Sequence, residues 1–182
     1  MHQIRIHGRG GQGVVTAAEL IAIAAFYDGK NAQAFPAFGV ERSGAPIESF
    51  ARIDDKPIRI REQISEPDIL IVQDPTLIGN PVIERGTNKK TIVIINSSKG
   101  KKEINLNLPL ANIYLVDAAK IALEKIGKNI ANTTILGAFA RATGLVSLEA
   151  LKKAIKEKFK DKGQETIDKN ISAIEEAYSK NF

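Results

Sequence analysis

Residues 7–14 read HGRGGQGV, and they are the segment that most clearly indicates the fold class. Before it, residues 3–7 (QIRIH) alternate between polar and apolar side chains as a short strand does. After it, residues 14–27 form an almost wholly apolar run of helical length. The loop glycines fit the pattern G-x-G-x-x-G: Gly8, Gly10 and Gly13. Between a strand and a helix, this pattern predicts a ligand-binding βα unit.

Further strand and turn signals place this unit in an α/β sheet. Residues 31–35 are expected to form the second strand. Three continuous apolar runs are typical of strands buried inside a parallel sheet: residues 68–73, 91–95 and 113–116. Residues 47–53 and 58–61 flank the turn DDKP at residues 54–57, which predicts a hairpin. We therefore expect a three-layer α/β/α Rossmann-like domain with a mostly parallel, mixed sheet.

The second half of the chain is mainly helical in its patterning. Four helices are expected, over residues 118–126, 133–143, 147–162 and 164–178. Asp117, Asn132 and Ser147 stand where a side chain would cap the first three. No linker is long enough to separate two domains. The sequence therefore predicts one domain over residues 1–182, with C-terminal helices from about residue 147.

Composition excludes several classes of function. The chain has 182 residues, no cysteine and two histidines, so it cannot hold a thiolate zinc site, an iron–sulfur cluster or a cysteine nucleophile. A formal charge of +5 suits anionic ligands but is too small to indicate nucleic acid. No apolar run approaches the ~20 residues of a membrane span, and no signal peptide is visible. We expect a cytoplasmic protein that binds no metal, nucleic acid or membrane.

The glycine loop leaves two interpretations open. Free N–H groups at the start of a helix bind anions, and Arg9 adds a positive charge, so a phosphate, pyrophosphate or carboxylate is the natural ligand. A dinucleotide-binding domain would also place an acid at the end of its second strand, but Asp28 precedes that strand. Alternatively, the glycines only let the strand and helix pack closely. His7 is a ligand group or a satisfied strand end.

A second loop, at residues 36–46 (PAFGVERSGAP), is expected beside the glycine loop. Both loops should lie at the carboxyl edge of the sheet, where ligands of open α/β sheets bind. Phe35 and Phe38 favour a contact surface, and Glu41 with Arg42 would stand at that edge unless they form only a surface ion pair. Neither a Ser/His/Asp set, a Walker lysine nor a thiamine diphosphate fingerprint is present. A ligand edge without catalytic residues indicates a subunit.

The two loops resemble a known family. HGRGGQGVVTAAELIA at residues 7–22 and QAFPAFGVERSGAP at residues 33–46 are similar to the gamma subunits of 2-oxoacid:ferredoxin oxidoreductases. Pyruvate:ferredoxin oxidoreductase (pyruvate synthase) is the nearest type. The similarity continues through residues 52–74 and 132–151. Ser43 departs from the pattern, because many members have a second arginine there.

The resemblance implies a protein without its own redox centre. Thiamine diphosphate and its Mg²⁺ would be held by alpha and beta subunits, and iron–sulfur clusters by a delta subunit. The assembled enzyme would convert pyruvate, CoA and oxidised ferredoxin to acetyl-CoA, CO2 and reduced ferredoxin. In related enzymes the 2-oxoacid is 2-oxoisovalerate or 2-oxoglutarate, and the sequence does not choose among them.

From this resemblance follows a hypothesis about the two loops. The buried first helix and the loop at residues 35–46 would contact the catalytic subunits. Residues 8–13, with Arg9 and Arg42, would offer N–H groups and charge to CoA phosphates or to a neighbouring carboxylate. The ligand and interface residues are expected to be Gly8, Arg9, Gly10, Gly11, Gln12, Gly13, Phe38, Gly39, Glu41 and Arg42. The competing hypotheses are a stand-alone nucleotide-binding Rossmann-type domain and an adaptor whose glycine loop is purely architectural.

Overall fold

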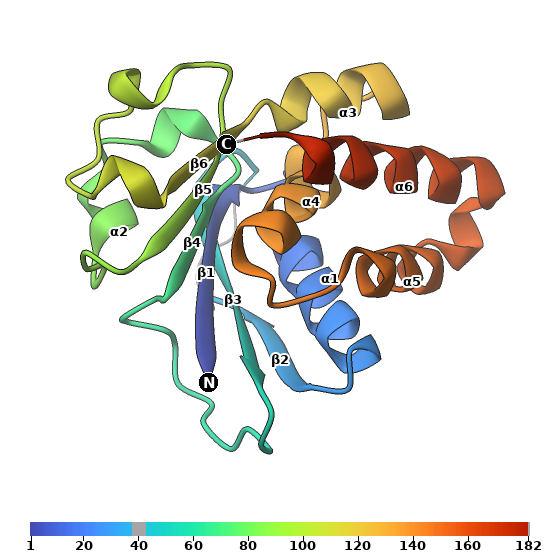
Figure 1. Cartoon of the computed structure of the whole chain (residues 1–182), viewed down its shortest axis with the longest axis horizontal. Helices are drawn as coiled ribbons and strands as arrows, with labels where there is room; N and C mark the ends of the chain where they lie inside the picture. Colours follow the sequence, from blue (N-terminus) through green and yellow to red (C-terminus); the bar gives the residue numbers. More distant parts are fainter. Residues whose placement is uncertain (38–42, 182) are drawn as a thin grey trace.

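The computed structural model describes residues 1–37 and 43–181 of the chain. Its strands are β1 (His2–Arg9), β2 (Asn31–Pro36), β3 (Pro46–Asp54), β4 (Ile69–Val72), β5 (Ile92–Asn96) and β6 (Ile113–Val116). Its α-helices are α1 (Val14–Tyr27), α2 (Pro81–Glu84), α3 (Ala118–Ile126), α4 (Ala131–Thr143), α5 (Leu148–Lys158) and α6 (Gln164–Ser179). Short 3₁₀ turns lie between them (Figure 1).

The strands form one sheet in the order β2-β3-β1-β4-β5-β6. β1, β4, β5 and β6 are parallel neighbours, while β3 runs antiparallel to both β1 and β2. The expectation of a mostly parallel, mixed sheet is therefore confirmed. The carboxyl ends of β1, β4 and β5 meet at one edge, which places the glycine loop beside Asp74 and Asn96.

The expected hairpin was wrong, although the antiparallel strand exists. Residues 58–61 form no strand, and β3 pairs instead with the two strands that precede it in the chain. Hydrogen bonds from side chains of the sheet, and not backbone strand pairing, fix the position of this segment. Gln33 donates to the carbonyl of Ile58, and the Arg52 guanidinium donates to the carbonyls of Ile60 and Glu62.

The helices are divided unequally between the two faces of the sheet (Figure 1). The five longer helices cover one face, with α1 and α4 against the strands and α5 and α6 packed on them. The four-residue α2 lies on the other face with loops and 3₁₀ turns. Along β4, Ile69 and Ile71 belong to the core under the long helices, whereas Leu70 and Val72 belong to a smaller core opposite. Both faces of β4 are thus buried, which explains its continuous apolar run.

The apolar character of α1 is explained within the chain. Ala17, Leu20 and Ala24 are all fully buried, and the helix packs against the sheet on one side and α5 on the other. A helix enclosed on several sides needs no partner subunit to cover it. The α1 helix therefore belongs to the core of this chain.

Two expectations about helix ends needed correction. Asp117 and Ser147 do cap α3 and α5, because each side chain accepts a hydrogen bond from a first-turn N–H. Asn132, in contrast, lies inside the first turn of α4, and its side chain turns away toward the glycine loop. The α5 helix ends at Lys158 rather than near residue 162, and a 3₁₀ turn (Lys160–Lys162) leads to Gly163.

Candidate functional site

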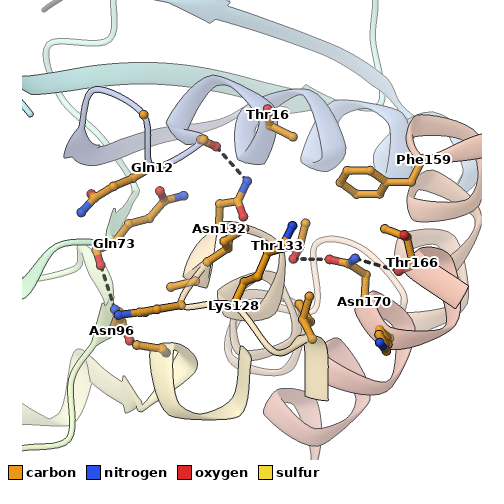
Figure 2. A pocket seen from close by; sticks show the side chains of 18 of the residues that line it. Gln12, Thr16, Gln73, Asn96, Lys128, Asn132, Thr133, Phe159, Thr166 and Asn170 are labelled. Atoms are coloured by element: carbon orange, nitrogen blue, oxygen red, sulfur yellow. Dashed lines mark hydrogen bonds between the residues drawn. The ribbon is translucent and has the colours of Figure 1, made fainter. Parts of the chain in front are cut away.

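A cavity of about 950 Å³ opens at the carboxyl edge of the sheet, between the glycine loop and the C-terminal helices. Its lining includes Gly11, Gln12, Gly13, Thr16, Gln73, Asp74, Asn96, Lys128, Asn132, Phe159, Lys162, Thr166, Lys169 and Asn170. Figure 2 shows Gln12 and Gln73 toward one end of this space and Phe159, Thr166 and Asn170 toward the other. The cavity thus joins residues from the glycine loop after β1 to the last helix, α6.

Glycine is required at different positions of the loop for different structural reasons. A Cβ on Gly8 would lie 2.6 Å from Cγ2 of Val14, so this glycine lets β1 and α1 pack closely. Gly13 has a φ of 72°, and a Cβ there would collide with the Asn132 amide. Gly11 has a φ of 92° and open space around it. The architectural interpretation therefore accounts for Gly8 and Gly13, whereas Gly11 leaves room for a ligand.

Arg9 and Gln12 are engaged within the chain. The Asp74 carboxylate accepts hydrogen bonds from Arg9 Nε at 3.1 Å and Gln12 Nε2 at 2.9 Å, and a further bond from the Thr76 N–H. Burial alone would raise the pKa of Asp74, but the hydrogen bonds from Thr76 and Gln12 and the nearby Arg9 charge together lower it. Asp74 is therefore ionised at neutral pH and offsets the charge of Arg9. These bonds also tie the glycine loop to the end of β4.

Arg9 and the glycine loop also contact the last residues of the second loop, Gly44 and Ala45. Arg9 Nη1 donates to the Gly44 carbonyl, and Gly10 exchanges backbone hydrogen bonds with Gly44 and Ala45. Gly10 thus contributes to this junction through its main chain. Phe38, Gly39, Glu41 and Arg42, which the sequence placed in the site, lie outside the described residues.

Two buried amide side chains face the cavity with unpaired atoms. Gln73 is 3% exposed, and neither its Oε1 nor its Nε2 has a hydrogen-bond partner within the described part of the chain. Asn132 is 6% exposed; its Nδ2 donates to the Gly13 carbonyl at 3.3 Å, while its Oδ1 is unpaired there too. A buried polar atom without a partner costs about 1–3 kcal/mol. Such atoms on a cavity wall are available to bond to a ligand that enters the cavity.

Positive charge lines the cavity from its middle, where Figure 2 labels Lys128, to the end formed by α6. Lys169 pairs with Glu165 at 2.6 Å, whereas the ammonium groups of Lys128 and Lys162 have no ion pair among residues 1–37 and 43–181. Phe159 adds an aromatic surface, and Thr133 donates to Asn170 Oδ1 at 2.7 Å behind it. This end can hold an anion by charge, which the glycine-loop end, with Arg9 offset by Asp74, cannot do as strongly.

His7 is a satisfied residue of the strand, facing away from the cavity. Its Nε2 accepts a hydrogen bond from Arg5 Nε at 3.0 Å, and the ring is 2% exposed. Burial, reinforced by the charges of Arg5 and Arg85, lowers the pKa of His7 to about 3. A neutral, enclosed imidazole is no general acid or base at neutral pH.

Asp28 also has a role within the fold. Its carboxylate accepts bonds from the backbone N–H of Ser147 at 2.6 Å and from Ser147 Oγ at 2.7 Å, beside the start of α5. The described residues at the end of β2 are Phe35, Pro36 and Ala37, which include no acid. The ribose-binding acid of a dinucleotide site is therefore missing from this part of the chain.

Sequence reasoning missed four residues of the cavity. Gln73 ends β4 and Asn132 stands near a helix start, positions that a turn or a cap explains equally well. Lys128 and Lys162 stand in lysine-rich segments typical of a solvated surface. A signal for Asn132 did exist, because its side chain occupies the space that Gly13 leaves open. That contact joins residues 119 positions apart and is invisible without the fold.

The described residues contain no group of three or more His, Asp or Glu side chains placed to hold a metal ion. Within the same residues, no helix is long and apolar enough to cross a membrane. The groups around the cavity are amides, hydroxyls, lysines and two carboxylates, of which Asp74 is engaged with Arg9 and Gln12 and Glu165 with Lys169. This arrangement can bind a ligand but offers no nucleophile paired with a base.

Comparisons with known proteins match the chain over nearly its full length. The family model described as pyruvate ferredoxin/flavodoxin oxidoreductase covers residues 3–180. The common gamma subunit of the pyruvate and ketoisovalerate oxidoreductases of Thermococcus kodakarensis is 53% identical, over 99% of this chain and 97% of that protein. The pyruvate synthase subunit PorC of Methanocaldococcus jannaschii is 51% identical, over 98% and 96%. The crystal structure of pyruvate oxidoreductase subunit PORC from Thermotoga maritima superposes with a TM-score of 0.84 at 39% identity, covering 98% of this chain and 96% of that one.

Proposed function

The chain belongs to the pyruvate ferredoxin/flavodoxin oxidoreductase family, and on this premise we propose how it works as a gamma subunit of a pyruvate:ferredoxin oxidoreductase complex. The complex converts pyruvate, CoA and oxidised ferredoxin to acetyl-CoA, CO2 and reduced ferredoxin. This chain is a subunit of an oxidoreductase and carries no complete catalytic site. Its contribution is to bind and orient a substrate for chemistry that occurs in other chains.

The cofactors of the reaction belong to the partner subunits in this proposal. Thiamine diphosphate with Mg²⁺ is held by the alpha and beta subunits, and iron–sulfur clusters by the delta subunit, which passes electrons to ferredoxin. The lack of cysteine in this chain supports that division, because clusters are held by cysteine thiolates. Residues 1–182 act as one domain in the cytoplasm, with α5 and α6 packed on α1 and α4.

The substrate that this chain binds is CoA, and the observation that carries this assignment is the cavity. CoA combines phosphates, an aromatic base and a long polar arm. The cavity offers lysines without ion pairs, the Phe159 ring and unpaired amides in one continuous space. The first-turn N–H groups of α1 have no acceptor inside the helix and add donors at the glycine loop. Arg9 and Gln12 act by holding that loop against Asp74.

The second loop completes the site at its border with the catalytic subunits. Its residues Phe38, Gly39, Glu41 and Arg42 follow β2, whose end is adjacent to the end of β3. In this proposal Arg42 reaches a CoA phosphate and the aromatic residue contacts a partner chain. The positive charge needed near the glycine loop then comes from Arg42, since Asp74 offsets that of Arg9.

Affinity purification tests the assignment to a complex. We expect a tagged copy, expressed in its native anaerobic cells, to recover thiamine- and cluster-binding chains with CoA-dependent pyruvate oxidation. A chain recovered alone, or one that binds NAD(P)H, would replace this function by the Rossmann-type nucleotide-binding alternative. The same purification from cells that carry the untagged chain controls for non-specific capture.

Substitution of Arg42 tests the role in CoA binding. In the reconstituted complex we expect Arg42→Ala to raise the KM for CoA about tenfold and to leave the KM for pyruvate unchanged. Arg59→Ala is the matched control, because Arg59 is exposed in the segment after β3, at the opposite edge of the sheet. Equal CoA dependence in both variants would remove Arg42 from the site.

A further inference from the structure

Gln73 is the most unusual polar residue of the cavity. Its main chain is fully engaged, since its N–H donates to His7 and its carbonyl accepts from Asn96 Nδ2 at 2.9 Å. Its carboxamide is buried with both polar atoms unpaired. The side chain lies over Gly8, because a Cβ there would stand 3.4 Å from Gln73 Oε1. The glycine loop therefore makes room for an amide group that the protein itself leaves unsatisfied.

A free carboxamide presents an acceptor and a donor side by side in one plane. The ligand edge that matches both has a neighbouring donor and acceptor, as adenine has at its 6-amino group and adjacent ring nitrogen. The pantetheine arm of CoA also contains amides, but a trans amide points its N–H and C=O in opposite directions. One carboxamide cannot bond to both groups of such an amide at once. The chemistry of Gln73 thus favours the base over the arm.

We propose that Gln73 recognises the adenine ring of CoA, with Asn132 Oδ1 accepting the remaining hydrogen of the 6-amino group. The inference rests on the proposed function and adds the orientation of the ligand within the cavity. Figure 2 shows both side chains on the wall of the same space, reached from β4 and from α4. The Asn132 Nδ2 bond to the Gly13 carbonyl leaves Oδ1 as its free atom.

Charge agrees with this orientation. The adenine is neutral and lies near Asp74, where the Arg9–Asp74 ion pair offers no net positive charge to a phosphate. CoA carries a 3′-phosphate and a 5′-diphosphate; in this orientation one group lies toward Lys128 and Lys162, which have no ion pairs among the described residues, and the other is left for Arg42. The pantetheine arm then leaves the cavity, and its thiol extends to the thiamine-binding subunits. In this orientation the subunit binds the nucleotide part of CoA, and the thiol reacts in another subunit. This agrees with a chain that has no catalytic groups of its own.

Competitive inhibition of the reconstituted complex tests the inference. The two inhibitors are adenosine 3′,5′-bisphosphate and the purine riboside 3′,5′-bisphosphate, which lacks only the 6-amino group. We expect the first to bind at least tenfold more tightly to the wild-type complex, because the site is built to bond that group. With Gln73→Met the ratio of the two inhibition constants should fall to near one. Gln164→Met, an exposed substitution of the same type, should leave the ratio unchanged.

The outcomes separate this inference from the proposed function. If Gln73→Met raises both inhibition constants equally, or changes neither, Gln73 does not read adenine and the inference is wrong. If pantetheine competes with CoA while adenosine 3′,5′-bisphosphate does not, CoA is bound but in the opposite orientation, which also overturns it. If the wild-type complex oxidises pyruvate without any CoA dependence, the proposed function itself fails. A melting temperature within about 2 °C of wild type shows that the variant complex is assembled.

Discussion

Two regions of this molecule bury polar side chains, and they do so in opposite ways. On the face of the sheet that α2 covers, Arg5 is 0% exposed and donates to His7 and to the carbonyls of Ser65, Ile83 and Arg85. At the carboxyl edge, Gln73 is as deeply buried and has an unpaired carboxamide. The first group is matched by the fold, whereas the second is not.

Buried polar groups that are hydrogen-bonded within the fold stabilise the structure, whereas unpaired ones are available to a ligand. Arg5 and Arg52 attach irregular segments to the sheet, because their guanidinium groups donate hydrogen bonds to the carbonyls of those segments. Their pKa values are lowered chiefly by burial, yet an arginine in a protein stays charged. Gln73 contributes no comparable bond to the fold. The proposed binding of a ligand accounts for its burial.

The largest expected effect is at Arg5. Arg5→Met should lower the free energy of unfolding by about 3–5 kcal/mol, because the buried Ile83 carbonyl, the His7 ring and two partly buried carbonyls lose a charged donor. Urea denaturation of the full chain, followed by circular dichroism, measures the change. Arg59→Met is the matched control and should stay within about 0.5 kcal/mol of wild type, because Arg59 is exposed.

A smaller effect distinguishes two glycines of the loop. Gly13→Ala should cost about 2–3 kcal/mol, because it combines a left-handed backbone with a collision against the Asn132 amide. Gly11→Ala has a similar positive φ with nothing within 4 Å, and should cost about 1 kcal/mol. The same denaturation experiment compares them. Equal costs would mean that the contact between Gly13 and Asn132 is unimportant.

The region around Arg5 and His7, whose buried polar groups are hydrogen-bonded, should also be the one that acid destabilises. His7 has a pKa of about 3 in the folded protein against 6.5 for a free histidine, so the unfolded chain binds more protons between those values. Stability is therefore lost as the pH falls from 6.5 toward 3, by about 2 kcal/mol at pH 5. His7→Gln keeps an acceptor for Arg5 and should flatten this slope. Parallel pH profiles of the two proteins would contradict the assignment.

An exposed carboxylate with full hydrogen bonding should matter least. Asp28→Ala removes the two bonds from Ser147 and should cost about 1 kcal/mol, the usual value for a helix-cap interaction. Thermal unfolding of the full chain measures it. A loss as large as that of Arg5→Met would show that burial is not what distinguishes the two kinds of contact.

The sequence predicted the elements of the fold well where local signals decide them. The glycine loop, the α1 helix at residues 14–27 and the β6 strand at residues 113–116 all lie where the pattern placed them. The strand expected at residues 58–61 was wrong, because the partner of β3 is set by the whole sheet. Local hairpin chemistry gave no information about that pairing.

Only the location of the site could be predicted from the sequence, not the bonding of its side chains. The glycine loop and the carboxyl edge followed from the βα pattern, but the unpaired state of Gln73 depends on contacts from β1, β5 and α1. The position of Asn132 depends on the packing of α4 against a loop 119 residues earlier. The engagement of Arg9 by Asp74 across two strands was equally hidden, and it changed where we place the positive charge of the site.

The most direct test of this account is the unfolding free energy of Gln73→Met beside that of wild type, measured on the full chain without ligand. We expect the variant to be as stable as wild type or up to about 1 kcal/mol more stable, because an apolar group replaces unpaired buried atoms. A loss of 2 kcal/mol or more would contradict the account, because Gln73 would then hold the fold as Arg5 does.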